Sequence, residues 1–62
     1  MNIKEKRTAK GLTQEQLAKL VNTDRSTVAK WETGGSLPRA DKLPTLATVL
    51  DCSVDELLRD AG

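Results

Sequence analysis

The chain has 62 residues, a formal net charge of +1, 37% hydrophobic residues and a single aromatic residue, Trp31. A chain of this length forms one domain, which buries only about 60% of the surface that it exposes when unfolded. Cys52 is the only cysteine, which excludes an internal disulfide and favours a reducing cytoplasm. The apolar stretches are too short for a membrane span or a secretion signal, and we expect neither.

The two halves of the chain differ in charge. Residues 1–31 carry seven basic and three acidic side chains, a net charge of +4, whereas residues 32–62 carry three basic and six acidic ones, a net charge of −3. This asymmetry suggests one face that meets a polyanion, although two solvated faces explain it equally well.

The residues that start and stop helices predict five of them, at residues 3–10, 14–21, 25–33, 43–51 and 54–60. Gly11 suits the left-handed turn that follows a helix. Thr13 and Gln16 have the spacing of a capping box, which begins the second helix. Asn22 tolerates a left-handed conformation at the end of that helix, and Asp24 is placed to cap the third.

The C-terminal half has the same kind of signals. Gly34 and its neighbouring glycine end the third helix, and the loop 34–42 that follows is the only long connection. Pro44 suits the first turn of the fourth helix, where its missing N–H is not needed. Ser53 and Glu56 form a second capping box, which begins the last helix.

The second and third predicted helices are separated by only three residues, an arrangement typical of a DNA-reading helix-turn-helix. Small Ala18 lies where the two backbones are expected to cross closely. Val28 and Trp31 form one apolar stripe, and the lone aromatic fits a core position better than base stacking. Polar and small residues occupy the opposite face of the third helix: Arg25, Ser26, Ala29, Lys30 and Thr33.

The stretches "GLTQEQLA", "STVAKWETG" and "SVDELL" follow one another at a spacing typical of one family. From Ile3 to Leu58 the chain resembles the lambdoid phage repressor and Cro family, also called the XRE-type helix-turn-helix. The resemblance implies an all-α, compact five-helix, lambda-repressor-like domain with its helix-turn-helix at helices two and three. It also implies a dimer on a near-palindromic operator and control of transcription.

The resemblance also indicates which side chains meet DNA. Arg25, Ser26 and Lys30 occupy the family's base-reading positions, and an arginine there can donate two hydrogen bonds to guanine O6 and N7. Arg7 and Glu32 match an ion pair that ties the first helix to the end of the third. We expect phosphate contacts from Arg7, Lys10, Gln14, Thr23, Thr27 and Arg39.

Three residues around the turn between the last two helices form the candidate homodimer interface. Cys52 is expected to be a buried structural thiol. Val54 and Leu57 fit either an ordinary core or an apolar patch for dimerisation, and we favour the patch. Lys6 stands where many family members have leucine, which predicts a loosely anchored first helix.

An enzyme is not expected, because the chain has no histidine, no tyrosine and no phosphate-binding glycine loop. For the same reason we expect no catalytic residue, no metal, no cofactor and no small-molecule ligand. The favoured function is a sequence-specific, double-stranded DNA-binding transcriptional regulator, a repressor in a bacterial cytoplasm or encoded by a phage. Alternatives are an antitoxin or restriction-control protein of the same fold, and a protein-interaction module that has lost DNA binding.

Overall fold

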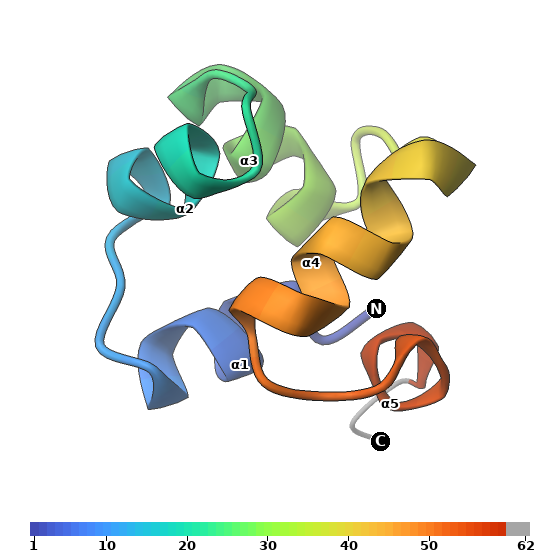
Figure 1. Ribbon diagram of the computed structural model, residues 1–62. Helices are drawn as coiled ribbons and strands as arrows, with labels where there is room; N and C mark the ends of the chain where they lie inside the picture. Colours follow the sequence, from blue (N-terminus) through green and yellow to red (C-terminus); the bar gives the residue numbers. More distant parts are fainter. Residues whose placement is uncertain (60–62) are drawn as a thin grey trace.

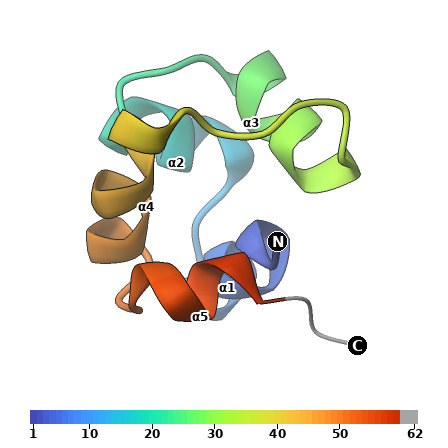
Figure 2. The ribbon, with the colours of Figure 1, turned by 90° about the vertical axis from the view of Figure 1, so that its right-hand side faces the viewer.

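The computed structural model describes residues 1–59, and in this range the chain forms five α-helices, one short 3-10 helix and no strand (Figure 1). In chain order these are α1 (Ile3–Ala9), α2 (Gln14–Leu20), α3 (Arg25–Thr33), η1 (Ala40–Lys42), α4 (Leu43–Val49) and α5 (Val54–Leu58). The predicted all-α, five-helix architecture is confirmed. Helices α2 and α3 lie at one end of the molecule and α1 and α5 at the other, with α4 between them (Figures 1 and 2).

Two capping boxes begin α2 and α5 at the positions that the sequence predicts. The Thr13 hydroxyl accepts from the Gln16 amide at 3.0 Å, and the Gln16 side chain accepts from the Thr13 amide at 2.8 Å. The Ser53 hydroxyl accepts from the Glu56 amide at 3.1 Å in the same way. These bonds satisfy amides that would otherwise lack partners at a helix start.

The ends of four helices share one backbone geometry, with a single residue in the left-handed region: Gly11, Asn22, Gly34 and Asp51. In each case the next amide bonds back to a carbonyl five residues earlier, as Thr23 does to Ala18 at 2.8 Å. The sequence predicts the left-handed conformation for Gly11 and Asn22, and for Gly34 it predicts that the helix ends there. It does not predict this conformation for Asp51, whose φ is 58°.

Four predicted helices are therefore longer than the observed ones. The prediction of 43–51 is wrong by two residues, because α4 ends at Val49 as the chain turns toward left-handed Asp51. The helix predicted at 54–60 ends at Leu58, where Arg59 becomes extended, and residue 60 lies outside the described residues. The helices predicted at 3–10 and 14–21 each end one residue early.

Apolar side chains from every α-helix meet in one core. Its buried members are Ile3, Leu17, Ala18, Val21, Val28, Trp31, Leu46, Leu50 and Leu57. Ala18 is 2% exposed, which lets α2 and α3 pack closely, and the stripe of Val28 and Trp31 faces inward. Within residues 1–59 no helix is both long and apolar enough to cross a membrane.

Helix α1 contacts α5 through polar groups near its start. The Lys6 ammonium lies 3.5 Å from the Glu56 carboxylate, in a pair whose side chains are 31% and 52% exposed. The Asn2 side chain donates to the Glu56 carbonyl at 3.0 Å, and the Asn2 amide donates to the Leu57 carbonyl at 3.3 Å. Ile3 is buried in the core. The looser anchoring expected from Lys6 stays a prediction.

Candidate nucleic-acid interface

The turn between α2 and α3 is built by two local features. Asn22 has a left-handed φ of 60°, which reverses the chain directly after α2. The Asp24 carboxylate then accepts from the Thr27 amide at 2.7 Å and begins α3. The hydrogen bonds from Thr27 hold the pKa of this carboxyl below its ordinary value, so it is ionised at neutral pH.

Helix α3 has one buried face and one exposed face. Val28 and Trp31 are buried against the core, whereas Arg25, Ser26 and Lys30 are exposed. Ser26 and Lys30 are four residues apart and so lie on one side of the helix, with Arg25 in its first turn. All three predicted base-reading residues are therefore exposed, with Ser26 and Lys30 on one side of the helix and Arg25 at its start.

A buried network ties this surface to α1 and α2. Arg7 Nε lies 2.6 Å from Glu32 Oε2, and Arg7 Nη2 lies 3.2 Å from Glu32 Oε1. Gln14 Nε2 donates to Glu32 Oε1 at 2.9 Å, and Arg7 Nη1 donates to the Leu12 carbonyl at 2.7 Å. The Arg7 and Glu32 side chains are only 11% and 3% exposed, so the predicted ion pair is confirmed and is mostly buried.

The ionisation of Glu32 reflects two opposing effects. Burial raises the pKa of its carboxyl, but the hydrogen bonds from Arg7 and Gln14 outweigh burial, and the pKa falls below its ordinary value. Glu32 is thus a carboxylate at neutral pH that joins three helices. Arg7 and Gln14 are held in place by this contact, which leaves them limited freedom to move toward a ligand.

An open hollow of about 400 Å³ lies between the α1–α2 connection and the start of α3. Its lining includes three predicted DNA-contacting residues, Arg7, Gln14 and Arg25, together with the polar side chain of Thr13. The acidic side chain of Glu15 also lines this hollow, and Arg7 is already paired with Glu32. The hydrogen-bond donors of the hollow suit the phosphate oxygens of a nucleic acid, whereas Glu15 opposes them.

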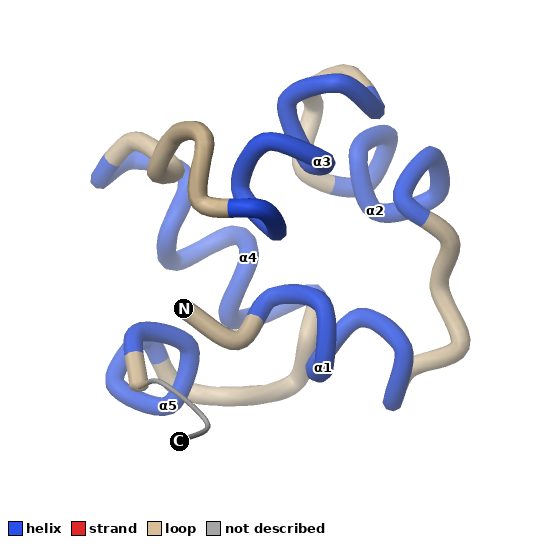
Figure 3. The backbone as a smooth tube through the Cα atoms, turned by 180° about the vertical axis from the view of Figure 1, so that it is seen from behind, coloured by secondary structure: helices blue, strands red, loops and turns tan. Residues whose placement is uncertain are grey.

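The other predicted phosphate contacts differ in position. Thr23 and Thr27 are half-buried near the start of α3. Residues 34–39 form the loop that leads from α3 to η1 (Figure 3), and Arg39 at its end is 86% exposed, 3.8 Å from the Asp41 carboxylate.

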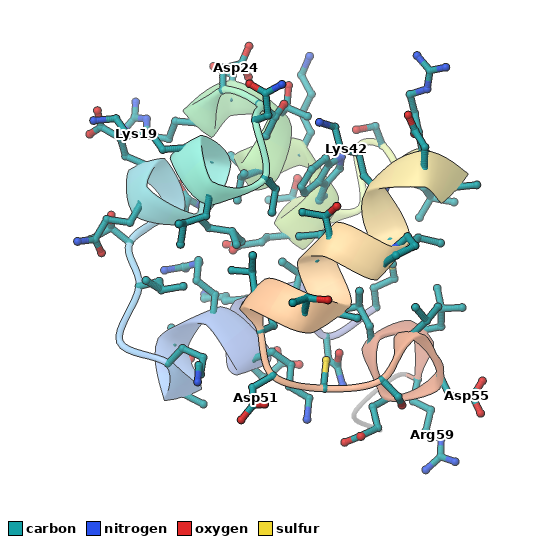
Figure 4. All side chains as sticks on the ribbon, in the orientation of Figure 1. Lys19, Asp24, Lys42, Asp51, Asp55 and Arg59 are labelled. Carbon is teal, nitrogen blue, oxygen red and sulfur yellow. The ribbon has the colours of Figure 1, made fainter. Side chains whose placement is uncertain are left out.

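Lys10 lies at the end of α1, and its ammonium is 3.9 Å from the carboxylate of Asp51, in a pair whose side chains are 44% and 85% exposed. Asp51 lies at the end of the molecule away from α3 (Figure 4). An exposed pair of this kind is weak and leaves the lysine able to reach other partners, so the phosphate contact of Lys10 stays a prediction.

The predicted dimer residues also need a correction. Leu57 is completely buried in the core of the single chain, so it leaves no surface for a partner. Cys52 and Val54 are half-buried, and burial raises the pKa of the Cys52 thiol. The neighbouring Leu58, which the sequence analysis did not select, is 48% exposed.

Lys42 is a further residue that the sequence analysis missed. Its ammonium lies 2.7 Å from the Val21 carbonyl and 3.2 Å from the Asn22 carbonyl, in the turn between α2 and α3. No local sequence signal marks this contact, because its partners are about twenty residues away. Among residues 1–59 no group of three or more His, Cys, Asp or Glu side chains is placed to hold a metal ion.

The chain matches the family model described as Helix-turn-helix over residues 3–57. It therefore belongs to this helix-turn-helix family, and the resemblance to XRE-type proteins is confirmed. It is 40% identical over 52 residues to the HTH-type transcriptional activator BcrR of Enterococcus faecalis. The matched part covers 84% of this chain but 26% of BcrR, so this chain spans about a quarter of that relative.

Two solved structures have closely similar folds. The restriction-modification controller protein C.AhdI from Aeromonas hydrophila is 45% identical, with a TM-score of 0.82 over 90% of this chain and 85% of that one. A transcriptional regulator from Listeria innocua is 33% identical, also with a TM-score of 0.82, over 98% of this chain and 60% of that one.

Proposed function

We propose that this chain is a sequence-specific, double-stranded DNA-binding transcriptional regulator that inserts α3 into the major groove. The observation that carries the proposal is the division of α3 into a buried stripe and an exposed polar face. A helix that presents hydrogen-bonding side chains beside a tight turn from another helix has the geometry for reading base edges. The family and both kinds of relatives support this function.

Three exposed side chains of α3 are the proposed base readers. Arg25 lies in the first turn, where its guanidinium can donate to guanine O6 and N7 together. Ser26 and Lys30 follow on the same side of the helix. These contacts select the sequence, because each base pair presents a distinct pattern of donors and acceptors in the major groove.

Residues around the hollow and the loop after α3 are the proposed phosphate contacts. They are Arg7, Lys10, Gln14, Thr23, Thr27 and Arg39. Phosphate contacts set the register of a protein on DNA but carry no sequence information themselves. Arg7 and Gln14 are preorganised by Glu32, which reduces the entropy that they lose on binding.

We further propose that the chain acts as a homodimer on a near-palindromic operator. One reading helix covers few base pairs, and two-fold dimers of this motif place their half-sites roughly 34 Å apart. The interface would use Cys52, Val54 and Leu58 around α5, on the opposite end of the molecule from α2. Repression is the proposed effect, with the protein acting in the cytoplasm without catalysis or a cofactor.

Control of a restriction-modification system is a second candidate function. Its support is the 45% identity with C.AhdI, which extends over 90% of this chain and 85% of that protein. The two candidates share the same DNA-binding surface and differ in the genes that the operator adjoins. A restriction or modification gene beside the coding sequence would favour the second.

Selection of bound sites from a random duplex pool tests the proposal. We expect one enriched motif with two related halves, and an Arg25→Ala variant should lose the preference for one position in each half. A chain that binds no duplex even at low salt would contradict the function and favour a protein-interaction module. Enrichment of a single half without symmetry would contradict the dimer alone.

A further inference from the structure

Lys42 lies in the 3-10 helix η1 and contacts the turn between α2 and α3. It is the last residue of η1, and its ammonium binds the carbonyls of Val21 and Asn22, 2.7 Å and 3.2 Å away. Figure 4 shows Lys42 beside the segment that joins α2 to α3. These carbonyls follow the last turn of α2, where a helix leaves carbonyls without partners and favours a positive charge.

The turn that Lys42 binds is also held by its amides and by the Val21 side chain, which is buried in the core. The amides of Asn22 and Thr23 bond back to α2, to the carbonyls of Lys19 at 3.3 Å and Ala18 at 2.8 Å. The Val21 and Asn22 carbonyls point the other way, toward Lys42. Lys42 therefore fixes the orientation of the two peptide groups through which the chain passes from α2 to α3.

We propose that Lys42 is a positioning residue that sets the angle at which α3 is presented to DNA. The inference rests on the proposed DNA-reading function of α3. Small misplacements of a binding group weaken directional hydrogen bonds steeply, and bidentate base contacts are directional. A lysine in the 3-10 helix that follows α3 thus determines sequence discrimination without touching DNA.

The same geometry distinguishes Lys42 from a residue that contacts phosphate. Two of the three N–H groups of its ammonium are directed at carbonyl oxygens, and the residue is half-buried. Arg39, three residues earlier, is 86% exposed and serves as the matched control. Arg39 and Lys42 lie on one segment, but replacing each of them should have a different effect on the salt dependence of DNA binding.

The test compares Lys42→Met, Lys42→Arg and Arg39→Met on two duplexes, the preferred site and the same site altered at the base that Arg25 reads. Lys42→Met should weaken binding to the preferred duplex about tenfold, the size of loss expected when one directional base contact is misplaced. It should weaken binding to the altered duplex much less, with the dependence of log affinity on log salt unchanged. Lys42→Arg should retain most of the discrimination, because arginine also donates to carbonyls.

The control variant should show the opposite pattern. Arg39→Met should weaken both duplexes equally and make the salt slope shallower by about one unit. A slope that becomes shallower by that amount in Lys42→Met would overturn the proposal and make Lys42 a phosphate contact. Equal losses on both duplexes with an unchanged slope would overturn it as well, and leave Lys42 a role in stability alone.

Amide hydrogen exchange in Lys42→Gln provides a test that needs no DNA. Exchange at Thr23, in the turn, should accelerate by a larger factor than exchange at Leu17, whose amide bonds to the Thr13 carbonyl at 3.0 Å. Equal acceleration at both amides would contradict local positioning. If the unsubstituted protein does not distinguish the two duplexes, the proposed function fails, while the exchange experiment still decides what Lys42 does to the turn.

Discussion

Replacing Glu32 with alanine should remove a large part of the stability of this domain. The Glu32 side chain is 3% exposed and accepts hydrogen bonds from both Arg7 and Gln14. In Glu32→Ala the Arg7 guanidinium, itself 11% exposed, loses its counter-ion. Removing one partner of a buried ion pair costs about 3–5 kcal/mol, because the remaining charge stays desolvated.

We expect a loss at the lower end of that range, about 3 kcal/mol. Arg7 Nη1 keeps its hydrogen bond to the Leu12 carbonyl at 2.7 Å, so the guanidinium is not left entirely without partners. A domain of this size has a total stability of about 3–9 kcal/mol. Each kcal/mol corresponds to about 4–8 °C in a small domain, so the melting temperature should fall by about 12–24 °C.

Thermal unfolding followed by circular dichroism measures this effect. The control is Asp41→Asn, which removes the carboxylate 3.8 Å from Arg39 in a pair whose side chains are 73% and 86% exposed. Such an exposed pair contributes at most about 1 kcal/mol, so the control should melt close to the parent. If Glu32→Ala also melted within about two degrees of the parent, the reasoning from burial would be refuted.

Three further predictions concern pH, reading and assembly. Burial raises the pKa of the Glu32 carboxyl, but the hydrogen bonds from Arg7 and Gln14 outweigh burial and hold this pKa below its ordinary value of 4.5. The Glu32 carboxylate therefore stabilises the fold fully above pH 4.5, and this stabilisation is lost as the pH falls through the lowered pKa. Urea unfolding at several pH values should accordingly show a weaker acid dependence for Glu32→Ala than for the parent. Arg25→Ala should cost about 1–3 kcal/mol on the preferred duplex and much less on a duplex altered at the contacted base, which paired titrations measure; equal losses would assign Arg25 to phosphate. Leu58→Asp should abolish cooperative filling of the two half-sites with little change in melting temperature, and unchanged cooperativity would exclude α5 from the interface.

Local chemistry explains why helix starts could be predicted from the sequence. The capping boxes at Thr13 and Ser53 involve residues three apart, so each can be recognised without knowing the fold. The apolar stripe of α3 is equally local, which is why the burial of Val28 and Trp31 followed from spacing. The pairing of Arg7 with Glu32 was expected from the family resemblance, since no spacing rule connects residues 25 apart.

The residues that the sequence did not place correctly depend on tertiary contacts. Leu57 and Leu58 are adjacent and identical, and only the packing of α5 against the core decides that the first is buried. Lys42 is a long, flexible cation whose partners lie in a distant turn. The left-handed conformation of Asp51 was not expected, because this conformation is far commoner in glycine.

The left-handed backbone at Asn22 and Asp51 has a consequence for engineering this domain. Both positions end a helix with a residue that has a side chain, where Gly11 and Gly34 end the other two without one. The Cβ atom strains this conformation, so each of these two turns stores a small unfavourable energy that replacement by glycine would release. The turn at Asp51 also lies at the far end of the molecule from α3 (Figure 4). Under the proposed mode of binding, Asp51→Gly should therefore change thermal stability without changing the bases that α3 reads.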